Sequence, residues 1–210
     1  MGKLARKLSG KFIVIDGPDG AGKSTQVRLL AESLRAAGVE LCTVRDPGGT
    51  VIGDKVRQIL LDVGHQAMDP ATETMLFMAS RAQLVAEVIR PALAAGKCVL
   101  SDRYISSTIA YQGAAGVDPA AIRAVADVAV GGLWPDLTIL LDLPAEEGLR
   151  RLARDHDRME AKGLAFHQRV REGFLRQAQE DPQRFEVVSA VGPTQDVQQR
   201  LRQAVEGRWK

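Results

Sequence analysis

The stretch Gly17-Pro18-Asp19-Gly20-Ala21-Gly22-Lys23-Ser24 decides the fold of this chain. It follows the apolar run 12–15 and opens the amphipathic stretch 25–37, which is the order strand, turn, helix. The backbone N–H groups of such a turn, together with the positive end of the helix dipole, bind phosphate oxygens. Lys23 is placed to reach the β and γ phosphates of ATP, and the Ser24 hydroxyl to hold Mg²⁺. The stretch therefore predicts a phosphate-binding loop, whose ATP-binding residues end with Thr25.

The alternative interpretation is a strand-to-helix turn that merely contains glycines. Such a turn requires neither a Lys-Ser pair at a fixed offset from the glycines nor an apolar strand before them. Because both features are present, the phosphate-binding interpretation is favoured.

Apolar runs of strand length occur at 12–15, 41–44, 98–100, 137–141 and 185–188, each separated from the next by a helical pattern. This alternation predicts a five-stranded parallel sheet covered by helices on both faces, the three-layer α/β fold of P-loop NTPases. Ligands of such sheets bind beyond the carboxyl ends of the strands. The residues that follow the first four runs are Asp16-Gly17, Arg45-Asp46, Asp102-Arg103 and Asp142.

Length and composition are those of an ordinary globular protein. The 210 residues suit one domain, predicted over 11–210 after a basic, solvated tail at 1–10. A formal net charge of +2 argues against a nucleic-acid-binding surface, and the first apolar run is too short for a membrane span.

The two cysteines bear on the redox compartment. Cys42 and Cys98 lack a C-x-x-C spacing, which predicts reduced thiols and a cytoplasmic location.

Two strand ends carry candidate functional charges, each with a structural alternative. Arg45 should lie at the rim of the site, although a surface salt bridge to Asp46 would explain it equally well. Asp102 occupies the place where phosphate-loop enzymes keep the acid that helps to bind Mg²⁺. Pairing of Asp102 with Arg103 is the structural alternative.

The helical segments supply candidates for binding a base and a sugar. Phe77 and Arg81 are four residues apart, so they share a helix face that could stack on and hydrogen-bond a flat heterocycle. From the pattern alone, however, a core Phe77 with a solvated Arg81 is the better interpretation. A later helix carries the further candidates Ser107, Thr108, Tyr111 and Gln112.

A helix that begins near Pro144 is expected to run into the arginine-rich stretch 150–160. On a continuous helix, Arg151, Arg154 and Arg158 would share one face. A solvated face is the ordinary interpretation of a charge run, but a lid at about 150–162 that closes over phosphates is favoured here.

The residues resemble bacterial thymidylate kinases from the phosphate loop to about Leu175. Five stretches carry the resemblance: Asp16 to Thr25, Arg45-Asp46-Pro47-Gly48-Gly49-Thr50, Phe77 with Arg81, Asp102-Arg103-Tyr104 followed by Ala110-Tyr111-Gln112-Gly113, and Asp157-Arg158-Met159-Glu160. The first is shared by many nucleotide-binding proteins, whereas the second and fourth in this order are much more specific. The resemblance implies a homodimeric enzyme that uses ATP and Mg²⁺ to convert dTMP to dTDP.

The resemblance also implies roles for particular residues. Phe77 would stack on thymine, Arg81 would bond its carbonyl, Tyr111 would lie beneath the deoxyribose, and Asp19 would contact the 3′-hydroxyl. The whole dTMP-binding set is then Asp19, Arg45, Phe77, Arg81, Arg103, Ser107, Thr108, Tyr111 and Gln112. The predicted catalytic set is Lys23, Asp102 and Arg103, to which the charge expected of the lid adds Arg154 and Arg158, and the predicted metal ligands are Ser24 and Asp102.

The chain departs from the family pattern at two positions that matter for function. Asp46 stands where the family usually has Glu, which shortens that side chain by one methylene. Gly20 stands where some relatives have Arg, so the lid arginines are expected to supply charge to the phosphates instead.

A kinase for another small acceptor is the nearest alternative function. A guanine-nucleotide switch is disfavoured, because the Asn-Lys-x-Asp turn that reads guanine cannot occur in a chain without Asn.

Overall fold

The computed structural model describes residues 2–152 and 158–209. Five parallel strands form one sheet in the order β2-β3-β1-β4-β5. Their bounds are β1 Phe12–Asp16, β2 Leu41–Arg45, β3 Cys98–Asp102, β4 Leu137–Asp142 and β5 Phe185–Ser189. Each predicted strand is confirmed, and each extends beyond its apolar run because it ends on the polar residues at the site edge.

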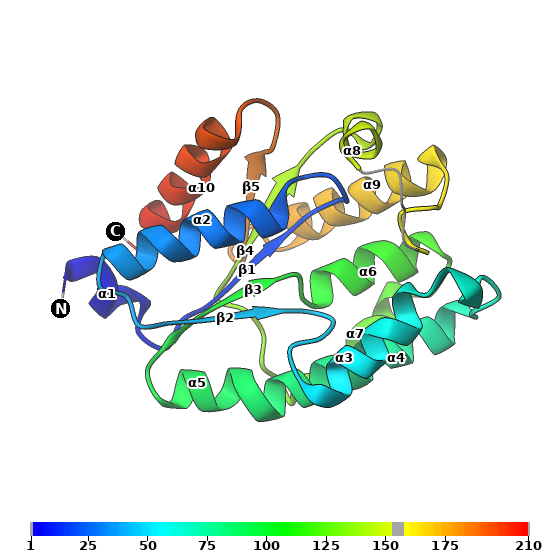
Figure 1. The fold of residues 1–210 in the computed structure, drawn as a ribbon, viewed down its shortest axis with the longest axis horizontal. Helices are drawn as coiled ribbons and strands as arrows, with labels where there is room; N and C mark the ends of the chain where they lie inside the picture. Colours follow the sequence, from blue (N-terminus) through cyan, green and yellow to red (C-terminus); the bar gives the residue numbers. More distant parts are fainter. Residues whose placement is uncertain (1, 153–157, 210) are drawn as a thin grey trace.

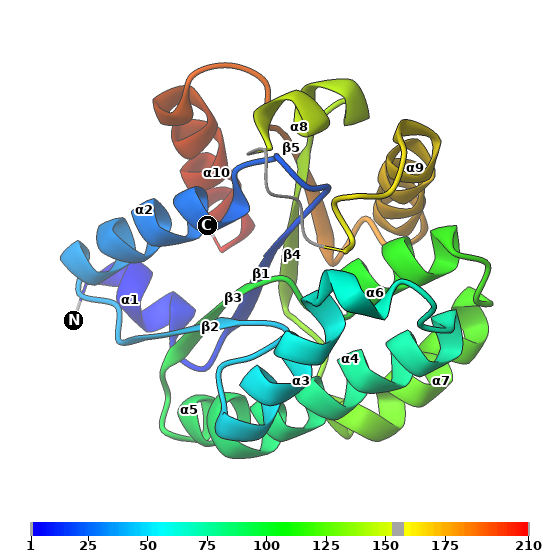
Figure 2. The same ribbon diagram turned by 45° about the vertical axis from the view of Figure 1, so that its right-hand side comes forward.

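Helices cover both faces of the sheet (Figures 1 and 2). They are α1 Lys3–Leu8, α2 Lys23–Ala36, α3 Val51–Leu61, α4 Pro70–Leu84, α5 Arg90–Ala94, α6 Ile105–Ala114, α7 Pro119–Val130, α8 Ala145–Arg151, α9 Leu164–Glu180 and α10 Thr194–Arg208. Short helices η1 Val63–His65 and η2 Val85–Ile89 lie between them. This is the predicted three-layer arrangement.

The alternation of side chains along β1 assigns the two core layers. Ile13 and Ile15 pack with the buried residues of α1, α2 and α10. Phe12 and Val14 point the other way and pack with α4, α5 and α7. Because all these β1 side chains are at most 1% exposed, the strand before the phosphate loop is fixed on both faces.

The N-terminal segment differs from the expected solvated tail. Residues Lys3–Leu8 form a helix, with Ala5 and Leu8 buried in the same core layer as α2 and α10. The basic side chains stay at the surface while two apolar residues, spaced three apart, supply a buried face. The tail prediction missed this short amphipathic pattern.

The long helical pattern over 71–95 is confirmed, including a break near Pro91. The segment runs as α4, the π-helical turn η2 and α5. Proline lacks the backbone N–H that a regular helix needs, and a π turn is one way for the chain to accommodate that loss.

Candidate active site

The phosphate loop joins the end of β1 to the start of α2. Gly22 has a left-handed backbone and precedes Lys23, the first residue of the helix. The Lys23 side chain is buried and its Nζ donates to the Pro18 carbonyl at 2.7 Å. Burial, and then repulsion from Arg103, lowers the pKa of Lys23 to about 8. The ammonium is thus held inside the loop, where an anionic ligand would replace its present partner.

A close approach of α8 explains Gly20. A Cβ on Gly20 would lie 2.2 Å from the Gly148 carbonyl oxygen, and a Cβ on Gly148 would lie 2.4 Å from the Asp19 carbonyl oxygen. Neither position accepts a side chain without moving backbone. The loop and α8 are therefore packed backbone to backbone, which accounts for the departure from an arginine at position 20.

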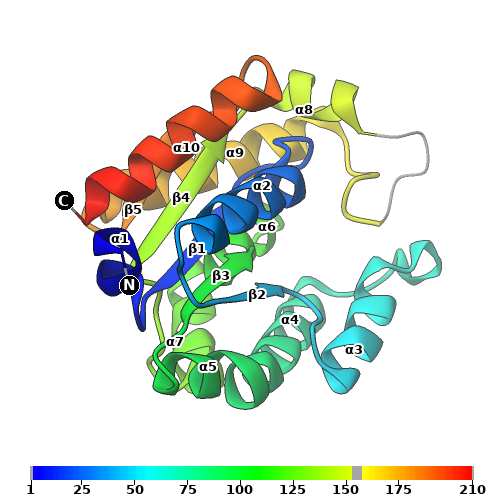
Figure 3. The same cartoon turned by 60° about the vertical axis from the view of Figure 1, so that its left-hand side comes forward.

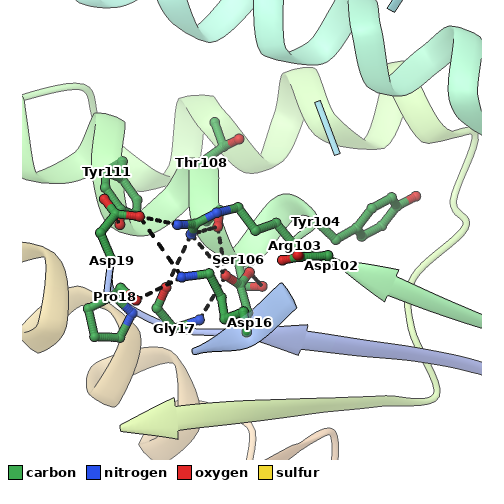
Figure 4. A network of polar contacts seen from close by, with 12 residues as sticks. Asp16, Gly17, Pro18, Asp19, Asp102, Arg103, Tyr104, Ser106, Thr108 and Tyr111 are labelled. Atoms are coloured by element: carbon green, nitrogen blue, oxygen red, sulfur yellow. Dashed lines mark hydrogen bonds and ion pairs between the residues drawn. The ribbon is translucent and has the colours of Figure 1, made fainter. Parts of the chain in front are cut away.

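Asp19, Arg103 and Tyr111 form a charged cluster beside the loop (Figure 4). Arg103 forms a short ion pair with Asp19, and the Tyr111 hydroxyl donates to the same carboxylate at 2.6 Å. Burial acts to raise the pKa of Asp19, but the charges of Arg103 and Lys23 hold it below its ordinary value. Burial and the Asp19 charge raise the pKa of Tyr111 well above its ordinary value, so the hydroxyl remains a donor.

Asp16 anchors this cluster, and sequence reasoning gave it no role. Its carboxylate is fully buried and accepts from the Ser106 hydroxyl at 2.5 Å and the Ser107 hydroxyl at 2.7 Å. Ser107 also accepts from Arg103 Nη1 at 2.9 Å. The end of β1 is thereby tied to the first turn of α6. A charged residue at a buried strand end, and two serines just after the strand Cys98–Asp102, were the available signal.

The two predicted metal ligands are neighbours. The Ser24 hydroxyl donates to Asp102 Oδ2 at 2.6 Å, although 78 residues separate them in the chain. The structural alternative of an Asp102–Arg103 ion pair is not what holds this carboxylate. One hydroxyl and one carboxylate oxygen therefore face each other beside the loop.

A cavity of about 380 Å³ opens at this edge of the sheet. Predicted site residues that line it are Asp19, Gly22, Lys23, Ser24, Thr25, Arg45, Phe77, Asp102, Arg103, Ser107, Thr108, Tyr111 and Gln112. Arg45 is exposed at the rim, and it forms no salt bridge within residues 2–152 and 158–209. The alternative of an Arg45–Asp46 surface pair is therefore wrong, since Asp46 has another partner.

That partner is Arg81, which is buried rather than solvated. Arg81 Nε donates to Asp46 Oδ2 at 2.5 Å, and Nη2 donates to Thr108 Oγ1 at 3.0 Å. Both acceptors line the cavity, so Arg81 lies behind its wall. Phe77 is half-buried and lines the cavity itself. The favoured pattern-based interpretation, a core Phe77 with a solvated Arg81, is thus wrong for both residues.

The arginine-rich stretch does not form one long helix. Helix α8 ends at Arg151, and Leu152 has an extended backbone with φ −68° and ψ 142°. Arg158 lies in a turn, where it is buried, donates Nε to the Leu60 carbonyl at 2.9 Å and pairs with Glu73. Because α8 ends at Arg151, Arg151 and Arg158 do not share a helix face. Arg154 lies outside the described residues.

A second cavity, of about 510 Å³, lies on the other side of the phosphate loop. It is lined by Gly20, Ala21, Gly22, Thr25, Gln26 and Arg151, together with Ala190, Gly192, Pro193 and Thr194 after β5. The Gln26 side-chain oxygen is buried and has no hydrogen-bond partner in the described part of the chain. Sequence reasoning missed this cavity because the loop after β5 carries no charged motif. Gly22 and Thr25 line both cavities.

A family profile described as thymidylate kinase matches residues 15–201. The chain belongs to the thymidylate kinase family. A thymidylate kinase of Pseudomonas fluorescens is 49% identical over 197 residues, which cover 92% of this chain and 94% of the relative. A thymidylate kinase of Deinococcus radiodurans is 47% identical over 202 residues, covering 95% and 98%. The family and enzyme class implied by the resemblance are confirmed.

A solved structure supports the fold of this thymidylate kinase family member. The crystal structure of thymidylate kinase from Ehrlichia chaffeensis matches with a TM-score of 0.78 at 31% identity, over 94% of this chain and 99% of that one. The elements that carry the site, from the phosphate loop to α9, lie within the match to the family profile. Figure 3 shows α8 and the α3–α4 pair at the end of the sheet where the strands finish.

Proposed function

We propose that this chain transfers the γ-phosphoryl group of ATP to the 5′-phosphate of dTMP, with the acceptor in the cavity of about 380 Å³ and the base of ATP in the second cavity. Conversion of dTMP to dTDP is the reaction of its family. The observation that carries the assignment of the two cavities is that they meet at the phosphate loop. A chain of phosphates can cross there from one cavity to the other.

The central chemical problem is to bring two polyanions together. A phosphate acceptor needs little help from a base, because its second pKa of ~6 leaves it mostly dianionic at neutral pH. Lys23 lies inside the loop, Arg103 beside it and Arg45 at the rim. These three cations would neutralise charge and align the reacting oxygens, so catalysis is positioning and electrostatics.

Ser24 and Asp102 suit a magnesium ion that arrives with ATP. Mg²⁺ prefers oxygen ligands and is usually held by one or two protein groups together with substrate phosphates and waters. A hydroxyl and a carboxylate 2.6 Å apart beside the loop provide such a pair. When bound, the ion would supply positive charge to the phosphate oxygens.

The remaining wall residues would bind the nucleoside of dTMP. The Asp19 carboxylate, oriented by Tyr111 and Arg103, is an acceptor for a sugar hydroxyl. Phe77 offers a half-buried ring for stacking on thymine. Arg81 would position Thr108 against the base through their hydrogen bond, or would contact the base itself if its side chain moves toward the cavity when dTMP binds.

The donor base would bind in the second cavity. The unpartnered Gln26 oxygen is an acceptor that suits the exocyclic amine of adenine, since adenine presents that donor and guanine presents a carbonyl there. Arg151 lines the same cavity and could stack its planar guanidinium on the base.

An acceptor panel tests the proposed function. The enzyme is assayed with ATP and each of dTMP, its ribose counterpart, dUMP, dCMP and dGMP. We expect dTMP to have the highest kcat/KM, because the cavity offers a stacking ring, a sugar acceptor and limited space around Tyr111. A higher kcat/KM for any other acceptor of the panel would overturn the assignment, and loss of activity when GTP replaces ATP is the expected control for the donor site.

We also propose that the chain forms a homodimer through the outer faces of α3, α4 and α7. These helices lie side by side and carry the exposed apolar residues Val51, Ile52, Ile59, Met75 and Val128. Val51 and Val128 are 74% and 84% exposed, which is costly unless a partner covers them. Sedimentation equilibrium should give twice the chain mass, and a monomer at micromolar concentration would contradict the proposal.

No helix in the described part of the chain has the length and apolar character needed to cross a bilayer. The cytoplasmic location remains a prediction.

A further inference from the structure

A buried polar network joins the turn at Arg158 to the wall of the acceptor cavity. Arg158 pairs with Glu73 on α4, and Glu73 Oε2 accepts from Gln112 Nε2 on α6 at 2.9 Å. All three side chains are nearly inaccessible, with exposed fractions of 4%, 2% and 0%. Burial of a charged pair is costly unless it is fully hydrogen-bonded, so this network calls for an explanation.

The charge of Glu73 fixes the orientation of the Gln112 amide. Glu73 forms an ion pair with the Arg158 guanidinium, and a carboxylate in an ion pair can only accept hydrogen bonds. The amide nitrogen of Gln112 must therefore face Glu73, and the amide oxygen must face away. This assignment follows from hydrogen-bonding chemistry rather than from the positions of hydrogen atoms.

The Gln112 oxygen that points away from Glu73 is an acceptor without a partner in the described part of the chain. Gln112 Oε1 is buried and makes no hydrogen bond within the described residues, while Gln112 lines the acceptor cavity. A buried unsatisfied acceptor is destabilising unless a ligand satisfies it. An acceptor base that presents an N–H would do so.

We propose that Glu73, held by Arg158, is a positioning residue that sets base selectivity through Gln112. The inference rests on the proposed function, in which the cavity binds the nucleoside. Thymine carries a hydrogen on ring atom N3, whereas N3 of cytosine is a bare acceptor. With the Gln112 oxygen fixed toward the base, thymine completes the network and cytosine places two acceptors against each other. Such unpaired buried polar groups reject a ligand more strongly than a missing methyl group does.

The primary test is Glu73→Gln. An amide at position 73 can donate as well as accept, so Gln112 is no longer restricted to one orientation. The ratio of kcat/KM for dTMP to that for dCMP is expected to fall at least about tenfold, through a higher KM for dTMP, while the KM for ATP stays within about twofold. Glu87→Gln is the matched control, because Glu87 accepts from the Gln83 amide at 2.8 Å on the exposed side of the same helical segment.

A swapped pair separates positioning from a structural effect. In Glu73→Gln/Gln112→Glu, the new amide donates to the new carboxylate, whose other oxygen again faces the cavity as an acceptor. Most of the lost dTMP selectivity should return. If Glu73→Gln does not fold, Gln112→Leu is measured in its place. Gln112→Leu should lose the selectivity for dTMP over dCMP, and the swapped pair should retain it.

The outcomes are distinguishable from failure of the proposed function. Wild-type enzyme that makes no dTDP from dTMP and ATP refutes the function itself. Wild-type enzyme that makes dTDP, together with unchanged base selectivity in Glu73→Gln, overturns only the role of Glu73. An equal rise in KM for ATP and dTMP would also overturn the role of Glu73, because that pattern indicates a general disturbance of the structure.

Discussion

Lys23→Ala is expected to lower kcat by about 10²–10³-fold while changing the KM for dTMP by no more than about threefold. The ammonium lies inside the phosphate loop, with its Nζ 2.7 Å from the Pro18 carbonyl and 3.9 Å from Asp19 Oδ1. Its charge would therefore act on the transferring phosphoryl group. Steady-state kinetics with both substrates give the two parameters, and Lys97→Ala, which removes an exposed lysine, is the control. A higher KM for ATP at unchanged kcat would mean that Lys23 only binds substrate.

The pH dependence provides a second readout of the same charge. Burial and then Arg103 lower the pKa of Lys23 to about 8, so the free enzyme loses this charge as the pH rises through 8. Since kcat/KM reports ionisations of the free enzyme, its value for ATP should fall above about pH 8. Bound phosphates favour the charged form, so kcat should persist to higher pH. Lys23→Arg should lack the decline, because arginine remains protonated; a wild-type kcat/KM that is flat to pH 9 would contradict the assignment.

The parts of the site that follow strand ends could be predicted because local sequence specifies them. The order of strand, glycine-rich turn and helix requires few distant contacts, and the carboxyl ends of parallel strands meet at one edge regardless of loop details. Asp102 and Ser24 illustrate this: each was assigned from its own segment, and the structure brings them within 2.6 Å.

Features that depend on packing between distant elements could not be predicted. Whether Arg81 is solvated depends on Asp46, which is 35 residues away. Arg158 contacts Leu60 of α3 and Glu73 of α4, and helical periodicity carries no information about such contacts. The pattern of a charge run cannot distinguish a solvated face from a segment whose arginine inserts between other helices.

The other large effect is expected from Asp46. Asp46→Ala should lower the free energy of unfolding by about 3–5 kcal/mol, because it leaves the Arg81 guanidinium buried without its ion-pair partner. Both side chains are 1% exposed, and the remaining acceptors of Arg81 Nη2, the Tyr104 carbonyl and Thr108, are uncharged. Denaturant titration measures the change. Glu32→Ala, which breaks the exposed Arg28–Glu32 pair, is the control and should have little effect.

Two further variants at this pair separate loss of charge balance from loss of packing. In Asp46→Leu/Arg81→Met the buried charge disappears together with its partner, so the double variant should be more stable than Asp46→Ala even though it lacks the ion pair. Asp46→Glu keeps the carboxylate but adds a methylene to a buried side chain whose ion pair with Arg81 must then shift, and a smaller cost of about 1–3 kcal/mol is expected. If Asp46→Ala unfolds at the same denaturant concentration as the wild type, the prediction is wrong, because the Arg81 charge is then stabilised by other groups.

The same variants should also affect substrate binding. Thr108 accepts a hydrogen bond from Arg81 Nη2 and lines the acceptor cavity, so each destabilised variant should show a higher KM for dTMP. We therefore expect the shorter carboxylate of this chain to affect dTMP binding through Arg81 and Thr108, from behind the wall of the cavity.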